Sequence, residues 1–397
     1  MKKALEILKK NPMLIALVFV MLFFHIWIVM TGRGSLFAPR NITNLISQNG
    51  YVIILATGML LCILTGGNID LSVGSMVCLV AALGATLIVK WNNNFLGIQG
   101  NVYTSIALCL LLGILLGAIQ AYWIAYVRIP AFIVTLAGML AYRGLALILL
   151  NAQTISPMPA EFTGYFGSFL PGASSAGSRL QISLITGAII CAVVVAVQLY
   201  SRVSKIRKNY DVENVRWMWA RLVVICAVII GSFYSFGKDR GIPVVLILLG
   251  VVVLTYYYYT AKTVPGRYLY AMGGNEKAAK LSGINTNGVL FFAYANMGFL
   301  AAVAALVCMA RFNSAFPTLG QSYELDAIGA CFIGGASAYG GIGTVGGTLI
   351  GTVFMGVLNN GMSILGINAN WQQVVKGAVL LTAVVFDVLS KKRKGGA

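Results

Sequence analysis

The sequence has very few of the residues that carry out chemistry in enzymes. Only ten of its 397 residues are acidic, and a single one, His25, is a histidine. A Ser/His/Asp triad needs a histidine beside its nucleophile, and a proton-coupled carrier needs several acidic residues within its membrane spans. The composition therefore argues against a hydrolase and against an ion-coupled carrier. We predict no catalytic residue, no metal site and no cofactor.

Two short motifs are also absent from the sequence. It has no glycine-rich loop that ends in Lys-Ser or Lys-Thr, so we do not expect the chain by itself to hydrolyse ATP. It has no Cys-x-x-Cys pair, and its seven cysteines all fall within apolar runs. These cysteines are therefore predicted to be buried thiols rather than disulfides or metal ligands.

Apolar residues are what the chain has in abundance. Hydrophobic residues make up 59% of the chain. Charged residues make up 10%, whereas about a quarter of the residues of soluble domains are charged. Apolar runs of about 20 residues, enough to cross a bilayer as a helix, recur along the whole sequence. The pattern predicts an all-α, polytopic membrane protein with about twelve transmembrane helices, ten to fourteen being possible because predicted boundaries are imprecise. The expected spans are 12–32, 45–65, 70–90, 104–126, 131–150, 181–200, 217–236, 242–261, 289–310, 326–341, 344–362 and 372–390.

The formal net charge of +18 is distributed in a way that opposes nucleic-acid binding. Basic residues cluster before the first span, in the segments 201–216 and 262–288, and in the C-terminal tail. Such clusters at alternate turns follow the positive-inside rule, which places both termini in the cytoplasm. The first apolar run is long enough to span, so we interpret it as an uncleaved signal anchor of a multi-pass membrane protein.

Two segments of the chain share one pattern. Residues 111–120 followed by Ile129-Pro-Ala-Phe resemble residues 349–359 followed by Ile367-Asn-Ala-Asn. This favours two related halves within a single transmembrane domain over residues 1–397, although two glycine-rich apolar runs can also resemble each other by chance. The predicted divisions are a first half, a central outer loop with extra helices, a cytoplasmic loop and a second half, at 12–150, 151–261, 262–288 and 289–390.

The polar stretch 266–283 is predicted to form a small docking element outside the bilayer. Asn275 can cap a helix that begins at Glu276, and Gly283 can end it in a left-handed turn. Glu276 and Lys280 stand four residues apart in the favourable order, which predicts an ion pair. Ala278, Ala279 and Ser282 would form a small face that a partner can approach closely. The alternative is an ordinary solvated loop helix.

Glycines and polar residues interrupt several of the spans. Gly343, Gly347 and Gly351 recur at four-residue steps and predict one stripe for close helix packing. The spans 326–341 and 344–362 are short and glycine-rich, so either can be broken or re-entrant. Glu324 and Asp326 are expected at the outer rim, near Arg311.

A polar break lies between the second and third spans. Asn68, Asp70 and Ser72 interrupt two apolar runs, and Asn359 and Asn360 lie within a later span. Polar groups at membrane depth are costly and tend to face cavities, so these five residues are candidates for a translocation path. The alternatives are that Asp70 caps the following helix and that the amides bridge neighbouring helices.

Four motifs together carry a resemblance to a known family. They are GGNIDLSVGS at 66–75, IPAFIVTLAGMLAYRGLALIL at 129–149, GRYLYAMGGNEKAAKLSGIN at 266–285 and IGGASAYGGIGTVGGTLIG at 333–351. With these motifs the chain resembles the permease subunit of bacterial monosaccharide ABC importers, the ribose, xylose and galactose branch. Its length and extra central helices are most similar to the xylose or multiple-monosaccharide permeases. Branched-chain amino-acid permeases share the broad fold, but the NIDLSVGS pattern favours sugar.

The resemblance implies partners and a mechanism. We expect a second copy of the permease, an ABC ATPase subunit on the cytoplasmic side, a periplasmic sugar-binding protein, and surrounding membrane lipid. ATP-driven alternating access would move a monosaccharide inward; another small polar solute and an ion-coupled secondary carrier are the alternatives. The polar stretch then becomes the coupling helix and its supports, which comprise Gly266, Arg267, Gly273, Asn275, Glu276, Ala278, Ala279, Ser282 and Gly283.

Overall fold

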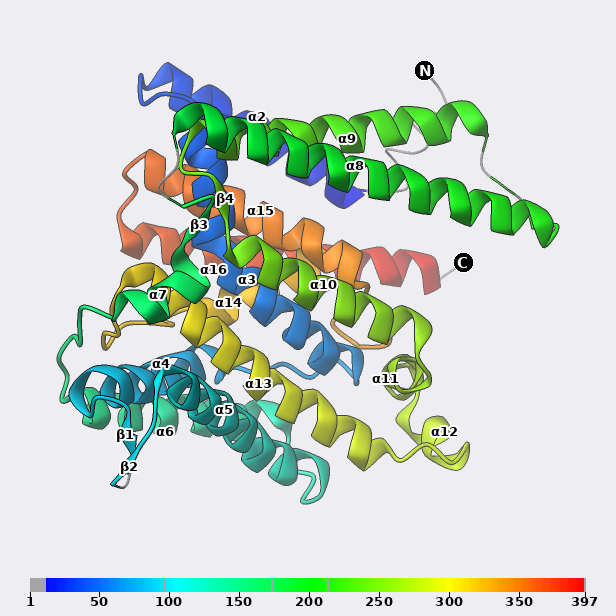
Figure 1. The fold of residues 1–397 in the computed structure, drawn as a ribbon. Coiled ribbons are helices and arrows are strands. Elements are labelled where there is room, and N and C mark those ends of the chain that lie inside the picture. Colours follow the sequence, from blue (N-terminus) through cyan, green and yellow to red (C-terminus); the bar gives the residue numbers. More distant parts are fainter. Residues whose placement is uncertain (1–11, 96, 173–174, 211, 213, 396–397) are drawn as a thin grey trace.

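A computed structural model describes residues 12–395 apart from 96, 173–174, 211 and 213 (Figure 1). Within these residues, ten helices are long and apolar enough to cross a membrane. They are α2 (Pro12–Met30), α3 (Pro39–Leu64), α4 (Val73–Ala85, continued by a π-helical turn over Thr86–Lys90), α5 (Val102–Ala125), α6 (Ala131–Leu150), α8 (Ala176–Arg207), α9 (Val215–Lys238), α10 (Val245–Lys262), α13 (Thr286–Phe312) and α16 (Ala369–Gly395). The predicted all-α, polytopic class is confirmed.

Two of the twelve predicted spans are not among these ten helices. The span expected at 326–341 is the 11-residue helix α14 (Tyr323–Ile333) followed by an irregular loop. At about 1.5 Å per residue, α14 covers only about half of a hydrocarbon core about 30 Å thick. The span expected at 344–362 is α15 (Val345–Ile364), which contains glycines and two asparagines and is not among the ten helices that are long and apolar enough to cross a membrane. Because α15 is largely buried within the protein, it does not need a lipid-compatible surface on every side.

The remaining elements are short. Helices α7 (Ala160–Gly167), α11 (Val264–Gly274) and α12 (Glu276–Leu281) lie outside the long bundle. Strands β1 (Asn94–Phe95) and β2 (Ile98–Gln99) form a small antiparallel hairpin. Strand β3 (Phe169–Leu170) pairs antiparallel with β4 (Ile242–Pro243). Because β3 precedes α8 and β4 follows α9, this pairing brings together the two ends of the segment that contains both helices.

The core is built around two antiparallel helices, α3 and α13. Arg311 near the end of α13 donates to the carbonyl of Gln48 near the start of α3, at 3.2 Å, and Cys62 near the end of α3 contacts Ala293 early in α13. Helix α3 packs on α14 and α15, while α13 packs on α4 and α5. Likewise α16 packs on α14, as α6 packs on α4. The same contacts thus occur twice in opposite orientation, the arrangement of an inverted repeat.

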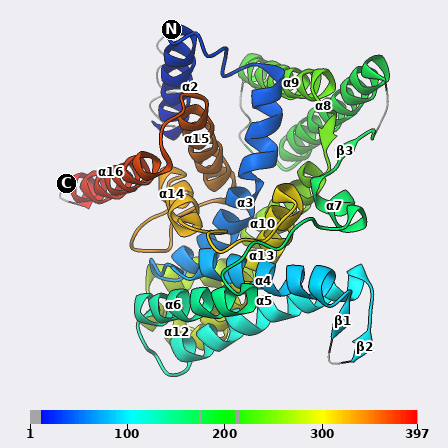
Figure 2. The same cartoon turned by 90° about the vertical axis from the view of Figure 1, so that its left-hand side faces the viewer.

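Helices α8 and α9 lie at the side of this arrangement. They pack chiefly on each other, and α9 reaches the core through α3 and β4 (Figure 2). The contacts therefore agree with an inserted pair between two related halves, and the domain boundaries given above stay a prediction.

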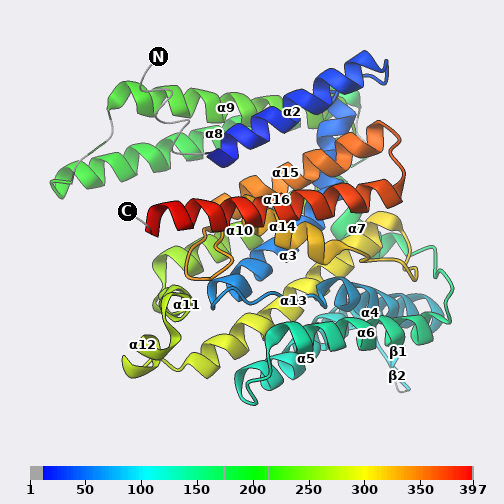
Figure 3. The same cartoon turned by 180° about the vertical axis from the view of Figure 1, so that it is seen from behind.

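The two ends of the described chain lie at the same end of the molecule. The start of α2 and the end of α16 are at the end of the molecule that also carries α11 and α12, as seen from both sides in Figures 1 and 3. The predicted orientation puts this end in the cytoplasm. Residues 1–11, which hold the first cluster of lysines, lie outside the described residues.

Candidate coupling and translocation site

Helix α12 begins and ends as its sequence predicts. The side-chain oxygen of Asn275 accepts a hydrogen bond from the backbone N–H of Ala278 at 3.0 Å, which caps the first turn. Gly283 follows the helix with φ at +84°, the left-handed conformation that glycine adopts without strain. These two local features set a six-residue helix across the end of the bundle.

The acidic residue of α12 pairs with a distant arginine. Arg128, in the turn between α5 and α6, places its Nη1 2.5 Å from Oε1 of Glu276. Its Nη2 donates to Thr286 Oγ1 at 3.3 Å and to Asn287 Oδ1, both in the first turn of α13. The predicted pair of Glu276 with Lys280 is therefore replaced by a tertiary contact. One guanidinium thus joins α12, the α5–α6 turn and α13.

Only part of the small face predicted on α12 is exposed. Ala278 and Ser282 are exposed, but Ala279 is only 5% exposed, so its methyl group packs inward. The helix also leaves a large apolar side chain open to a partner, that of Leu281 at 89% exposure, which the sequence reasoning did not single out. An exposed leucine in a polar helix is a signal that could have identified it.

Two glycines bring the segment 266–283 into close contact with the core. A Cβ on Gly273 would lie 1.9 Å from the carbonyl oxygen of Leu64 and 2.4 Å from the amide nitrogen of Gly341. A Cβ on Gly266 would lie 2.1 Å from the carbonyl oxygen of Tyr259. Both glycines therefore pack against backbone atoms of neighbouring elements, while Arg267 is exposed.

Two irregular loops meet next to Gly273. Loop 65–72 leads into α4, and loop 334–344 leads from α14 to α15. A Cβ on Gly67 would lie 2.0 Å from the carbonyl oxygen of Ala338, and one on Gly340 would lie 2.4 Å from the Cα of Gly66. The N–H of Gly341 also donates to the carbonyl of Leu64 at 3.1 Å. We call these two loops, together with Gly273, the glycine seam.

The predicted glycine stripe is only partly helical. Gly347 and Gly351 lie on α15 and pack on α14, since their Cβ atoms would come within 2.2 Å of the Gly334 oxygen and 1.9 Å of the Ala330 oxygen. Gly343 instead lies in the loop before α15, with φ at +155°. The prediction of one stripe from all three is therefore wrong, because the helix begins only at Val345.

The polar break contains a fully buried carboxylate. Oδ1 of Asp70 accepts from the backbone N–H of Ser72 at 2.9 Å and from its hydroxyl at 2.6 Å. The Ser72 hydroxyl is also hydrogen-bonded to Gln120 of α5, whose Nε2 lies 2.9 Å away. Oδ2 of Asp70 meets no hydrogen-bond donor within the part of the chain that the structure describes. Among the described residues, the Asn68 side chain donates only to Thr65, three residues before it.

A second buried carboxylate lies in the other half. Asp326 is 0% exposed and pairs with Lys376 of α16 at 2.9 Å, while Tyr51 of α3 donates to its Oδ2 at 2.6 Å. Nδ2 of Asn359 lies 3.5 Å from its other oxygen. The expected rim contact between Asp326 and Arg311 is therefore wrong, because Asp326 faces the protein interior.

The five candidate path residues thus fall into different networks. Asp70 and Ser72 share one with Gln120, Asn359 belongs to the Asp326 network, and Asn360 donates to the carbonyl of Asn41 at 3.3 Å. Sequence reasoning missed Gln120, Tyr51 and Lys376. A lone lysine or glutamine within an apolar run is the signal that could have identified two of them.

Comparison with known proteins places the chain in a family. Residues 41–384 match the family described as branched-chain amino acid transport system / permease component. The xylose transport system permease protein XylH of Haemophilus influenzae is 37% identical over 381 residues, covering 96% of both chains. That of Escherichia coli K12 is 36% identical, covering 96% of this chain and 92% of the relative.

The ribose import permease protein RbsC of Escherichia coli K12 is 34% identical over 360 residues, covering 91% of this chain and 89% of the relative. No solved structure matches the chain. The relatives are named as transport permease components, so the chain is a transport subunit and not an enzyme. It belongs to the permease family of branched-chain and sugar ABC transporters, and is similar over most of its length to xylose and ribose permeases.

Proposed function

We propose that this permease moves a monosaccharide inward across the bacterial inner membrane by alternating access, driven by a separate ATPase subunit. The observation that carries the proposal is the seating of α12. It is a short, capped, exposed helix, and it is fastened at the same time to the α5–α6 turn, to α13 and, through Gly273, to the glycine seam.

In this proposal α12 is the coupling helix that the ATPase moves. Leu281, Ala278 and Ser282 form the exposed surface that enters the ATPase, and Asn275 and Gly283 hold the helix ends. Glu276 faces Arg128, so it transmits the movement to α5 and α13. Gly266 and Gly273 keep the backbone of α11 against α10 and α3.

The glycine seam gives this movement a route to the membrane interior. Backbone-to-backbone contacts hold loop 65–72 against loop 334–344. A shift of Gly273 therefore acts directly on the loops that precede α4 and follow α14. Movement of the first loop would uncover Asp70, and its free Oδ2 is an acceptor for the hydroxyl groups of a sugar.

The proposed partners fit other surfaces of the molecule. Helices α2 and α16 lie at the outside of the molecule (Figure 2). In their most apolar 18-residue stretches, only 11% of the residues of α2 and none of those of α16 are buried. These helices therefore offer apolar faces to lipid or to a second copy of the chain. The end opposite α12, which carries β1, β2 and α7, would receive a periplasmic sugar-binding protein. Both chain ends would lie in the cytoplasm with α12.

The proposal is tested in proteoliposomes that hold the permease with its ATPase and a sugar-loaded binding protein. We expect Leu281→Asp to abolish both uptake and the stimulation of ATP hydrolysis by the loaded binding protein, because a charge replaces the exposed apolar contact. Tyr210→Asp is the matched control. Tyr210 is exposed too, at 65%, but it lies in the loop between α8 and α9. Uptake that needs no ATPase would overturn the proposal.

A further inference from the structure

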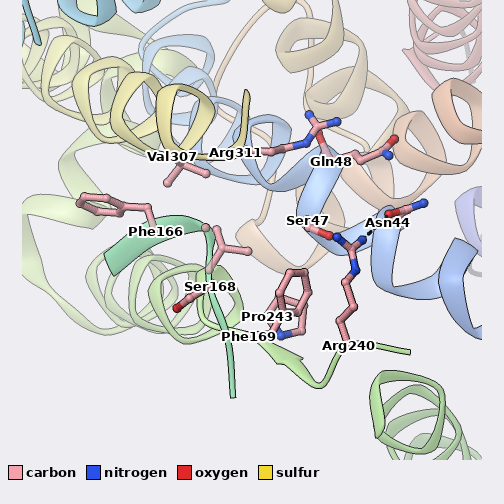
Figure 4. A pocket seen from close by; sticks show the side chains of 12 residues that line it. Asn44, Ser47, Gln48, Phe166, Ser168, Phe169, Arg240, Pro243, Val307 and Arg311 are labelled. Atoms are coloured by element: carbon pink, nitrogen blue, oxygen red, sulfur yellow. Dashed lines mark hydrogen bonds between the residues drawn. The ribbon is translucent and has the colours of Figure 1, made fainter. Parts of the chain in front are cut away.

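A separate polar cavity lies at the end of the bundle opposite α12. Its volume is about 180 Å³, and it is enclosed by the start of α3, the end of α13, the start of α10, and the segment where β3 meets β4 (Figure 4). Its polar lining comes from Asn44, Ser47, Gln48, Ser168, Arg240 and Arg311, with Phe169 on one wall. At about 30 Å³ per water molecule, the cavity holds about six waters, enough room for a small polar group.

The cavity carries two positive charges and no negative one. Both guanidinium groups point toward the α3 segment that holds Ser47 and Gln48 (Figure 4). No carboxylate is part of the lining within the residues that the structure describes. Asp239, next to Arg240 in the chain, is 3.5 Å from its Nε but lies outside the lining.

Both arginines are held in place and still have donors to spare. Arg311 donates through Nη1 to the carbonyl of Gln48 at 3.2 Å and lies over the ring of Phe312. Arg240 donates through Nη2 to Oδ1 of Asn44 at 3.2 Å and lies 4.6 Å from the centre of the Phe169 ring. Because each guanidinium has five N–H donors, most of them remain available to a ligand.

We propose that this cavity binds an oxyanion, a phosphate group held between Arg240 and Arg311. Arginine forks match the paired oxygens of phosphate, and such charge-assisted hydrogen bonds are roughly twice as strong as neutral ones. A neutral sugar could accept the same hydrogen bonds, but among the described residues it would leave Arg311 with no counter-charge in the cavity lining, and Arg240 with only its 3.5 Å contact to Asp239 outside the lining. The amides of Asn44 and Gln48 and the hydroxyl of Ser47 can complete the shell around the anion.

The bound anion would join two parts of the chain. Arg240 follows α9 and so belongs to the central insertion, whereas Arg311 ends the core helix α13. Other contacts between the insertion and the core are made by α7 on α13, by α9 on α3 and by α10 on α3. A phosphate between the two arginines therefore fastens the insertion to the core. Its source is either the headgroup of a phospholipid or free phosphate, and the experiment separates the two.

The first test is the thermal unfolding of delipidated, purified permease titrated with inorganic phosphate at constant ionic strength. We expect a saturable rise in the unfolding midpoint, with half-saturation at least tenfold weaker in Arg240→Gln and in Arg311→Gln. Arg40→Gln, an exposed arginine early in α3, should respond like the unchanged protein. An equal response in all four proteins, or none in the unchanged protein, would overturn the proposal.

A second variant keeps the proposal testable if the arginine variants fail to fold. Gln48→Glu places a nearly isosteric carboxylate in the cavity and supplies the missing negative charge from within. We expect it to raise the unfolding midpoint without phosphate and to abolish the response to phosphate. A lowered midpoint with the response unchanged would contradict an anion site.

The source of the phosphate is identified in nanodiscs followed by native mass spectrometry. A phospholipid retained by the unchanged protein and by Arg40→Gln, but lost from Arg311→Gln, identifies the lipid headgroup. Retention of inorganic phosphate alone, with the same dependence on Arg311, identifies free phosphate. Retention of neither a phospholipid nor inorganic phosphate by the unchanged protein would overturn the proposal.

Discussion

Arg128 and Glu276 form an ion pair across 2.5 Å, although 148 positions of the chain separate them. The pair lies at the end of the bundle and ties the short helix α12 to the turn between α5 and α6. The side chains are 40% and 42% exposed, so the pair is open to solvent screening. Its importance therefore lies in how it positions α12, since pairs this exposed contribute about 0–1 kcal/mol to stability.

We expect Arg128→Gln to uncouple transport from hydrolysis with little effect on stability. Loss of the guanidinium frees α12 from both α5 and α13, so ATP hydrolysis should continue while uptake per ATP falls several-fold. Glu276→Gln should behave similarly, and the double variant should be no worse than either single one. Additive losses in this double-mutant cycle would show that the two residues act separately.

Gly273 should tolerate no side chain at all. An added methyl group would meet backbone atoms of Leu64 and Gly341 at 1.9 and 2.4 Å, so Gly273→Ala must displace α11 from the seam. We expect a loss of about 1–3 kcal/mol in stability and a strong loss of uptake. Gly274→Ala is the matched control, because a Cβ there meets no atom within 4 Å. Equal behaviour of the two variants in thermal unfolding would contradict the packing role.

The buried pair of Asp326 and Lys376 predicts a large destabilisation when one partner is removed. Lys376→Met leaves an unpaired carboxylate at a position with 0% exposure, which typically costs about 3–5 kcal/mol. A second change, Asp326→Asn, should recover much of this loss by removing the stranded charge. The folded yield and the unfolding midpoint measure both effects. A single Lys376→Met variant as stable as the unchanged protein would argue against the pair.

Asp70 predicts a different outcome, because no lysine or arginine pairs with it among the described residues. Asp70→Asn keeps an oxygen that can accept from the Ser72 N–H and hydroxyl, so we expect the fold to persist. Uptake should fall at least tenfold if the free oxygen meets the sugar. Asn68→Ala, in the same loop, should change uptake much less. Normal uptake by Asp70→Asn would limit Asp70 to a role in the loop structure.

Local patterns predicted the local structure well. The apolar runs placed the ten long helices, and the cap at Asn275 and the turn at Gly283 are where their residue types indicate. Each of these features depends on neighbours within a few residues. The prediction was weakest over 326–362, where burial inside the protein lets α14 be short and α15 carry glycine and asparagine.

Contacts between distant segments could not be read in the same way. The pattern on α12 predicts a pair of Glu276 with Lys280, yet Arg128 takes the carboxylate because the fold brings the α5–α6 turn beside it. The sequence predicts Asp326 at the outer rim, but in the fold Asp326 is buried and pairs with Lys376 of α16. A carboxylate pairs with whichever cation the packing places within reach, and sequence spacing limits that choice only along a single helix.

The sequence by itself therefore determined a polytopic helical membrane protein, its basic polar segment and the termini of α12, since these follow from hydropathy, charge and capping within short stretches. Only the tertiary structure decided which carboxylates are paired, which glycines touch backbone, and where two arginines share a cavity. Those outcomes depend on the distance between helices that are far apart in the chain, and such a distance is fixed by packing.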